Sequence, residues 1–234
     1  MLEFEDIVKM TQRTLIKAIL KELKCAGYKT RRKKGFIYAS GCLPVMLVAH
    51  LDTVHKEIVK TICCFEDSNI LMSPEGIGGD DRAGVYMILR IINKHCCHVL
   101  FCEDEETGGM GADKFIKSRI KPEVNYIVQL DRRGDNSAVF YGCDNPEFTK
   151  FVTSFGFNKD IGSVSDISTI APSLGVAAAN ISAGFFREHT IDEYVDMNAV
   201  KNNIERVGEM VASKTKKFEY IEADFFKILR CDGS

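Results

Sequence analysis

The sequence predicts an α/β fold in which a mixed, largely parallel sheet lies between layers of helices, as a three-layer sandwich. Short apolar runs of strand length alternate along the chain with longer segments whose apolar residues recur at helical spacing, and this alternation is typical of such folds. Several short runs are apolar at every position, which indicates strands covered on both faces. Because its 234 residues contain no repeat or linker-like tract, we expect a single domain, residues 1–234.

The N-terminal half supplies the first elements. An apolar face at helical spacing predicts a helix within residues 1–26, which Gly27 is placed to end. Residues 28–40 are expected to form a hairpin, with the basic residues 30–34 in a solvated turn rather than in a nucleic-acid patch. The other predicted elements of this half are strands at 45–49, 58–65 and 69–72 and a buried helix at 81–92.

The C-terminal half continues the alternation. Its predicted strands are residues 98–103, 126–130, 138–141 and 176–181, and its predicted helices are residues 109–117, 146–155 and 198–213. Asp196 is positioned to cap the last helix. In sheets of this kind ligand sites form at the carboxyl ends of the strands, so the polar residues that follow the strands are the candidates for function.

Composition restricts the partners and the cellular setting. A formal net charge of -2 and a pI near 6.2 give no general attraction to nucleic acid or to an anionic membrane, and no apolar run approaches the roughly 18 residues of a membrane span. The nine cysteines are odd in number and no apolar signal segment opens the chain, which favours a reducing cytoplasm. The pairs Cys63-Cys64 and Cys96-Cys97 lack the spacing of a zinc chelate, and we interpret them as small core residues.

Metal-capable side chains follow separate segments of the chain. They are His50 and Asp52 after one predicted strand, Asp80 after a glycine-rich run, Glu105 and Glu106 after another strand, Asp131 at the end of a third, and His189 in a later polar stretch. Unpaired charge at the end of a buried strand is costly unless a metal or a partner neutralises it. Asp52, two residues after His50, points the same way and could orient the imidazole.

Each candidate also has an ordinary structural interpretation when it is taken alone. His50 could be a surface residue beside a turn, Asp80 and Asp81 a helix cap, residues 103–106 a solvated loop, Asp131 the partner of the following arginines, and His189 a polar loop residue. Their combination is more informative. Three carboxylates and two imidazoles match two metal shells with open positions, which is what hydrolysis requires.

In their order along the chain, these segments resemble the motifs of the co-catalytic dizinc exopeptidases, the superfamily that includes peptidase T, carboxypeptidase G and aminoacylase. The matching segments lie within residues 45–197 and are HLD (50–52), GDDRAG (79–84), EETGG (105–109), Asp131 and HTIDE (189–193). Five motifs in one order are far more specific than any single motif. The resemblance implies the phosphorylase/hydrolase-like fold of the zinc exopeptidases.

The resemblance also implies a role for each position. Asp80 would bridge two divalent ions, His50 and Asp131 would complete one shell, and Glu106 and His189 would complete the other. Asp52 would orient His50, and Glu105 would be the general base and acid. Zinc is the expected metal, with cobalt or manganese as alternatives. Members of the family often have a cis peptide bond after the bridging aspartate.

The sequence departs from peptidase T and its nearest relatives in one respect. They insert a lid domain between the positions matched by Asp131 and His189, but here this interval is only 58 residues and already holds predicted strands and a helix. We therefore expect a catalytic domain without a lid, which leaves substrate class and oligomeric state open. Candidates for substrate contact are Ser165 and Asp166, whose segment resembles the substrate-side Thr-Asp of the family, and Arg187. Asp166 could equally cap a following helix.

Three hypotheses for function follow. The first is a metalloaminopeptidase that acts on short peptides, favoured by an open, acid-rimmed site. The second is a carboxypeptidase or an N-acyl amino acid amidohydrolase, which would need a cationic group such as Arg132, Arg133 or Arg187 in the cleft to bind a carboxylate. The third is a noncatalytic binding protein that keeps metal only for stability. The presence of Glu105 argues against the third hypothesis, because a metal cage alone does not need a base.

Overall fold

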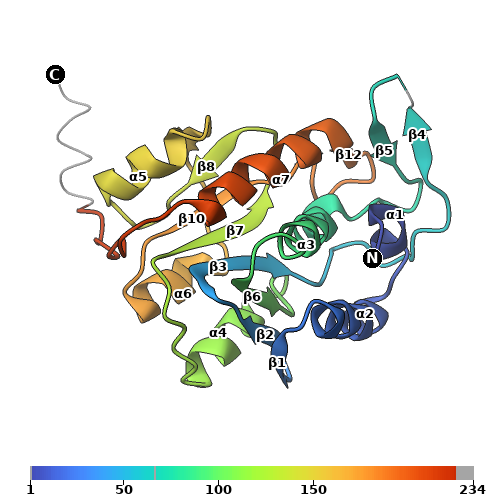
Figure 1. The fold of residues 1–234 in the computed structure, drawn as a ribbon. Helices are drawn as coiled ribbons and strands as arrows, with labels where there is room; N and C mark the ends of the chain where they lie inside the picture. The colour runs from blue at the N-terminus through green and yellow to red at the C-terminus, as the bar shows by residue number, and fades with distance from the viewer. Residues whose placement is uncertain (1, 66, 225–234) are drawn as a thin grey trace, which may run out of the picture.

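A computed structural model describes residues 2–65 and 67–224, with helices on both faces of a central sheet (Figure 1). The strands of this sheet are β1 (Lys29–Lys33), β2 (Phe36–Ser40), β3 (Leu43–His50), β6 (Cys97–Cys102), β7 (Tyr126–Arg132), β8 (Ser137–Val139), β9 (Asn158–Asp160) and β10 (Ala178–Ser182). The helices are α1 (Phe4–Val8), α2 (Gln12–Cys25), α3 (Gly79–Ile91), α4 (Met110–Lys117), α5 (Pro146–Thr153), α6 (Ile167–Leu174) and α7 (Met197–Ala212).

The sheet has the strand order β1-β2-β6-β3-β7-β10-β8-β9. Its centre is parallel, because β3 pairs in parallel with both β6 and β7, and β7 with β10. The β1–β2 hairpin joins one side of this centre in antiparallel orientation, and β8 joins the other. The prediction of a mixed, largely parallel sheet between helical layers is therefore confirmed.

Both faces of the central strands are buried, and alternate residues serve different cores. In β3, Leu47 and Ala49 belong to the apolar cluster beneath α2, α3 and α7, whereas Met46 and Val48 belong to the cluster beneath α4 and α6. Strands β6 and β7 divide their side chains in the same way. A strand with two covered faces needs apolar residues at successive positions, which explains the continuous apolar runs in the sequence.

A second, smaller sheet lies beside the first and was predicted only in part. It has the order β11-β12-β5-β4, with β4 at Cys63–Phe65, β5 at Ile70–Met72, β11 at Phe185–Phe186 and β12 at Tyr194–Asp196. Residues 58–62 precede β4 and are outside any strand, so the predicted strand 58–65 begins too early. Asp196 ends β12 and caps α7 by accepting hydrogen bonds from the backbone N–H groups of Asn198 and Ala199, as predicted.

Two other expectations need correction. The N-terminal helical segment is divided into α1 and α2, because the Thr11 side chain accepts a hydrogen bond from the Thr14 N–H and begins a new helix. Of the adjacent cysteines, only Cys97 is buried, and Cys63, Cys64 and Cys96 are exposed. The edge strand β4 has no covered face, so its cysteines do not reach the core. In residues 2–65 and 67–224, no helix has the length and apolarity needed to cross a membrane.

Candidate metal centre

Asp80 lies between two histidines that come from distant parts of the chain. Its Oδ1 is 3.0 Å from Nε2 of His50 at the end of β3, and its Oδ2 is 3.2 Å from Nε2 of His189 in the loop between β11 and β12. The Asp80 side chain belongs to the first turn of α3, where the peptide bond to Asp81 is cis. One carboxylate therefore presents each of its oxygens to a different imidazole.

A second carboxylate accompanies each histidine. Asp131, near the end of β7, places Oδ1 at 3.4 Å from Nε2 of His50, and Glu106, in the loop after β6, places Oε1 at 3.1 Å from Nε2 of His189. His50 is fully buried, whereas the His189 side chain is 51% exposed. The centre thus has one half inside the protein and the other half open to solvent.

Asp52 connects His50 to the loop that carries the two glutamates. Its Oδ1 is 3.3 Å from Nδ1 of His50, and its two oxygens accept hydrogen bonds from the backbone N–H groups of Glu105 (3.1 Å) and Glu106 (3.0 Å). The same carboxylate therefore lies beside the imidazole ring and fixes the backbone from which both glutamates project. Such a partner on the far nitrogen directs the other imidazole nitrogen toward a metal.

Asp81 and Glu193 support the backbone around Asp80. From the sequence, Asp81 was expected only as a possible helix cap, and Glu193 was given no role. The Asp81 carboxylate accepts hydrogen bonds from the N–H groups of His50 and Gly84. Glu193, with 0% exposure, accepts from the N–H groups of Gly78 (3.0 Å) and Asp80 (2.9 Å). Glu193 is the last residue of the HTIDE segment, and its position four residues after His189 was the only signal in the sequence.

Asp131 is held by three polar side chains, which are Gln129 of the same strand, Ser165 of the segment before α6 and Asn180 of β10. Its Oδ2 accepts hydrogen bonds from Nε2 of Gln129 (2.8 Å) and from Oγ of Ser165 (3.2 Å), and its backbone N–H donates to Oδ1 of Asn180 (3.0 Å). Ser165 is buried, and its single hydroxyl proton is shared between Oδ2 of Asp131 and the nearer Oε1 of Gln129. The structure therefore places Ser165 behind Asp131, among groups that position it.

Glu105 faces the same cleft but has no ion-pair partner among the described residues. Burial, together with the negative charges of Asp131, Asp166 and Glu106, raises the pKa of Glu105 to about 8, although His50 acts in the opposite direction. The centre therefore combines excess negative charge with a carboxylate poised to carry a proton near neutral pH.

The cleft above these residues has a volume of ≈ 130 Å³ and mixed charge. Its walls include Arg132, Arg133, Tyr141 and Glu188 besides the residues described above. Arg132 pairs with Asp160 at 2.8 Å, and Arg133 pairs with Glu188 at 2.7 Å. Both arginines of the cleft are thus already neutralised by carboxylates.

None of the three predicted substrate contacts is among the residues that line this cleft, since Ser165 lies behind Asp131. Asp166 is buried with 1% exposure and precedes α6, where its side chain makes no capping hydrogen bond. Arg187 is exposed and precedes Glu188, and its carbonyl accepts a hydrogen bond from Oγ1 of Thr190. The cleft is instead lined by the neighbours Ser163, Val164 and Glu188.

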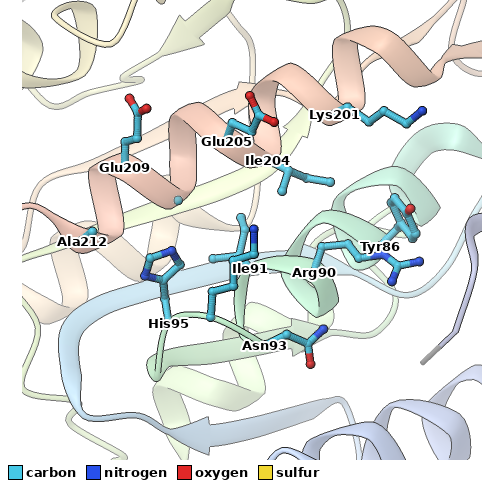
Figure 2. Close-up of a pocket in the computed structure, with 12 residues that line it drawn as sticks. Tyr86, Arg90, Ile91, Asn93, His95, Lys201, Ile204, Glu205, Glu209 and Ala212 are labelled. Atoms are coloured by element: carbon cyan, nitrogen blue, oxygen red, sulfur yellow. The ribbon is translucent and has the colours of Figure 1, made fainter.

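A larger cavity belongs to another part of the molecule. It has a volume of ≈ 700 Å³ and lies between α3 and α7. Figure 2 shows Ile91 and Ile204 between these helices, with Glu205 and Glu209 on α7 pointing away from α3. Within the described residues, the groups that could hold a metal involve His50, Asp80, Asp81, Glu106 and Asp131 and none of the residues of this groove. Its size therefore does not mark it as the reactive site.

The donor set around Asp80 fits divalent metal ions. In each of the combinations His50–Asp80–Glu106 and His50–Asp81–Asp131, the potential ligand atoms lie within 4.8 Å of one another. The oxygens of Asp81 already accept backbone hydrogen bonds, so the first combination is the more available. Burial opposes a charge on His50, but the surrounding carboxylates outweigh it and raise its pKa well above the ordinary value. These acids thus favour a cation at this position.

Comparisons with known proteins identify the fold. No protein-family model and no curated protein matches the sequence. The solved structure of aminopeptidase PepT from Bacillus cereus superposes with a TM-score of 0.73 at 14% identity, covering 90% of this chain and 97% of that chain. A tripeptidase from Staphylococcus aureus gives 0.72 at 14% identity, with 89% and 95% covered.

A third structure, the glutaminyl cyclase of Porphyromonas gingivalis, gives a TM-score of 0.61 at 16% identity and covers 89% of this chain and 92% of that chain. This chain therefore has the zinc-exopeptidase fold expected from the sequence. Proteins with different activities share this fold, so the chemistry has to be argued from the site itself.

Proposed function

We propose that this chain is a metal-dependent aminopeptidase that hydrolyses the first peptide bond of short peptides. The observation that carries the proposal is the position of Asp80, with one oxygen facing His50 and the other facing His189. A carboxylate placed in this way suits the shared ligand of a two-metal centre. The aminopeptidases and the tripeptidase with the same fold support this proposal.

In the proposed centre, His50, Asp80 and Asp131 would hold one divalent ion, and Asp80, Glu106 and His189 would hold the other. The donor set of imidazole nitrogens and carboxylate oxygens suits zinc, and cobalt or manganese are alternatives. When bound, such ions supply Lewis-acid activation of water and of the substrate carbonyl. Asp52 fixes the orientation of His50, through its contact with Nδ1.

Glu105 is the proposed proton carrier. Its carboxylate lines the cleft beside Glu106 and Asp131, and its backbone is fixed by Asp52. In the proposed reaction Glu105 accepts a proton from the attacking water and delivers it to the nitrogen of the leaving amine. A base of raised pKa is suited to both steps near neutral pH. This role gives Glu105 a function that a purely structural metal site would not need.

The charges of the cleft favour a substrate with a free amino end. Arg132 and Arg133 are each paired with a carboxylate, so no described arginine of the cleft is available to receive a substrate carboxylate without first losing its partner. Acidic residues without an arginine partner, among them Glu105 and Glu106, line the same walls. An ammonium group is attracted to such walls, whereas the second candidate function, cleavage of N-acyl amino acids, requires Arg132 or Arg133 to change partners.

The proposed enzyme works as one catalytic domain without a lid. Between Asp131 and His189 the chain forms β8, α5, β9, α6, β10 and β11, and all of these belong to the two sheets or to the helices that pack on them.

The eight described cysteines are free thiols, which suits a reducing compartment such as the cytoplasm.

The test compares two classes of substrate. Purified protein loaded with zinc, cobalt or manganese is assayed with amino-acid anilides and dipeptides, and separately with N-acetyl amino acids. We expect turnover of the unblocked substrates only, and we expect Glu105→Gln to lower kcat by about 10²–10⁴-fold without loss of metal. Asp104→Asn is the matched control, because Asp104 is an acid of the same loop whose positive φ asparagine tolerates.

The outcomes separate the alternatives. Cleavage of only the N-acetyl substrates would reject the aminopeptidase in favour of the amidohydrolase. If neither class is cleaved while metal binds, and Glu105→Gln changes nothing, the chain is a binding protein that uses metal for stability.

A further inference from the structure

A separate cavity of ≈ 250 Å³ lies at the start of α2 and shares Asp52, but no cleft-lining residue, with the candidate metal centre. Its walls come from the first turn of α2, the loop after β3 and the glycine-rich turn before α3. The residues that matter for its chemistry are Gln12, Lys56 and Arg82. None of them takes part in the proposed reaction.

Arg82 is the unexplained group of this cavity. Its side chain is almost fully buried, with 3% exposure, and its Nη1 has no hydrogen-bond partner among the described residues. The carboxylates of Asp52 and Asp81 are close enough to act on its charge, but the oxygens of both accept backbone N–H groups instead. A buried guanidinium with an unsatisfied donor is rare in a folded protein, because its desolvation is costly.

Gln12, which also lines this cavity, carries a second unsatisfied donor. Its Nε2 is buried and has no hydrogen-bond partner within the described part of the chain. Gln12 is the first residue of α2, a helix of 14 residues that begins after the N-cap Thr11, and the N-terminal end of a helix attracts anions. The exposed Lys56 adds a positive charge at the rim. Three features of this cavity thus call for an acceptor with negative charge.

We propose that this cavity binds a small oxyanion, a carboxylate or a phosphate, to which the Arg82 guanidinium and the Gln12 carboxamide donate. The planar guanidinium matches both groups, and the cavity is larger than the ~30 Å³ that one water occupies in the liquid. Two acids, Asp52 and Glu57, also line the walls. Asp52 is engaged with His50 and the glutamate loop, and Glu57 is exposed beside Lys60, so neither neutralises Arg82 through a hydrogen bond.

The test measures the binding of inorganic phosphate and of acetate. Isothermal titration calorimetry gives the affinity, and thermal unfolding gives the shift in unfolding temperature. Sodium chloride at matched ionic strength is the reference for non-specific salt effects. Both titrations are made with metal-loaded protein and with protein treated with EDTA. An anion bound at the metal centre disappears on chelation, whereas an anion bound by Arg82 remains. The comparison of phosphate with acetate identifies which oxyanion the cavity prefers.

Variants locate the bound anion. We expect Gln12→Leu to weaken binding about 10- to 100-fold, the loss of one hydrogen bond to a charged group, and Arg82→Met to remove it. Arg31→Met, at an exposed position of β1, is the matched arginine control and should bind as the wild type does. Because Arg82→Met could fail to fold, Gln12→Leu and Lys56→Gln, which leave the buried arginine in place, keep the test decisive.

Two results would overturn the proposal. One is wild-type protein whose unfolding temperature rises no more with phosphate or acetate than with the chloride reference. The other is binding that is unchanged in Gln12→Leu, Lys56→Gln and any folded Arg82→Met, because the anion then lies elsewhere. Neither result affects the proposed peptidase activity, which depends on different residues and is measured separately.

Discussion

Asp80 is the residue on which the two halves of the candidate metal centre depend. Each of its oxygens faces a different histidine, so removal of the charge should weaken both ion sites together. We expect Asp80→Asn to lower metal affinity by more than about 100-fold, beyond the 10- to 100-fold loss that is typical when an outer partner is changed. Metal content after dialysis is the measurement. Asp113→Asn, an exposed acid of α4, is the control, and retention of one ion in Asp80→Asn would contradict the shared role.

Glu193 acts on the centre through the backbone. Its carboxylate accepts the N–H groups of Gly78 and Asp80, and a glutamine in its place would turn one amide N–H toward such a donor. The cost of an unsatisfied buried group is about 1–3 kcal/mol. We therefore expect Glu193→Gln to lower the unfolding temperature and to weaken metal binding about 10- to 100-fold, whereas the exposed neighbour variant Asp192→Asn leaves both quantities unchanged.

Asp166 should make stability depend on pH. Burial, reinforced by Asp131 and Asp52, raises the pKa of Asp166 to about 7, although His50 and the neighbouring Cys102 thiol oppose this shift. A carboxyl whose pKa is raised by folding keeps its proton in the native state while the unfolded chain loses its proton. The contribution of Asp166 to the free energy of unfolding therefore falls as pH rises from about 4 to 7. Above about pH 7 this contribution stays constant.

Asp166→Asn removes this titration. In metal-free protein we expect the variant to gain about 2 kcal/mol relative to the wild type between pH 5.5 and pH 8. Chemical unfolding at both pH values is the measurement. An equal difference between the two proteins at pH 5.5 and at pH 8 would show that Asp166 does not titrate in this interval.

Among single residues, the sequence indicated those members of the candidate metal centre whose positions follow from local structure. His50 and Asp131 lie at the ends of buried strands, and Glu105 and Glu106 directly follow another, so their convergence follows from parallel strand order. The role of Glu193 was not predictable, because it depends on contact with a turn more than 100 residues earlier in the chain. The sequence alone could not place Arg82 in a cavity for the same reason.

Among the elements, helix α3 packs so closely against strand β7 that position 84 of the helix leaves no room for a side chain. A Cβ atom at Gly84 would overlap the carbonyl oxygen of Leu130 and the carboxylate of Asp81. We expect Gly84→Ala to lower the free energy of unfolding by about 1–3 kcal/mol or more, and to weaken metal binding because Asp81 also holds the N–H of His50.

Gly208 in α7 is the matched glycine for this experiment. A Cβ atom there would meet the His95 ring at 3.5 Å, an ordinary contact, so Gly208→Ala should stabilise the helix by about 0.5–1 kcal/mol. Denaturant unfolding of both variants is the measurement. If both substitutions change the free energy of unfolding in the same direction, the close approach of α3 to β7 is not the cause of the effect at Gly84.

The elements that the sequence did not reveal are short or atypical. Strands β9, β11 and β12 contain only two or three residues each, too few to show a period. Helix α6 contains Pro172, which normally argues against a helix. The long elements with one or two apolar faces, such as β3 and α7, were predicted within a few residues, since burial imposes their pattern directly.

For the molecule as a whole, metal binding and folding should be coupled. The candidate centre gathers several carboxylates around His50 and His189, and without a cation these acids repel one another. Zinc at 100 times its dissociation constant should stabilise the folded state by about 2.7 kcal/mol per site, which is roughly 5–10 °C in unfolding temperature for a domain of this size. A thermal scan with and without EDTA measures the effect, and an unchanged temperature would contradict a two-metal centre.

The wide separation of the donors along the chain has a consequence during synthesis. Under the proposed function, His189 has to dock against Asp80 and Glu106 before the second ion can be held. A nascent chain that ends before residue 189 can therefore bury most of its sheet and still lack a complete metal centre. Hydrolytic activity would therefore begin only late in translation, after His189 has been synthesised and has docked against Asp80 and Glu106.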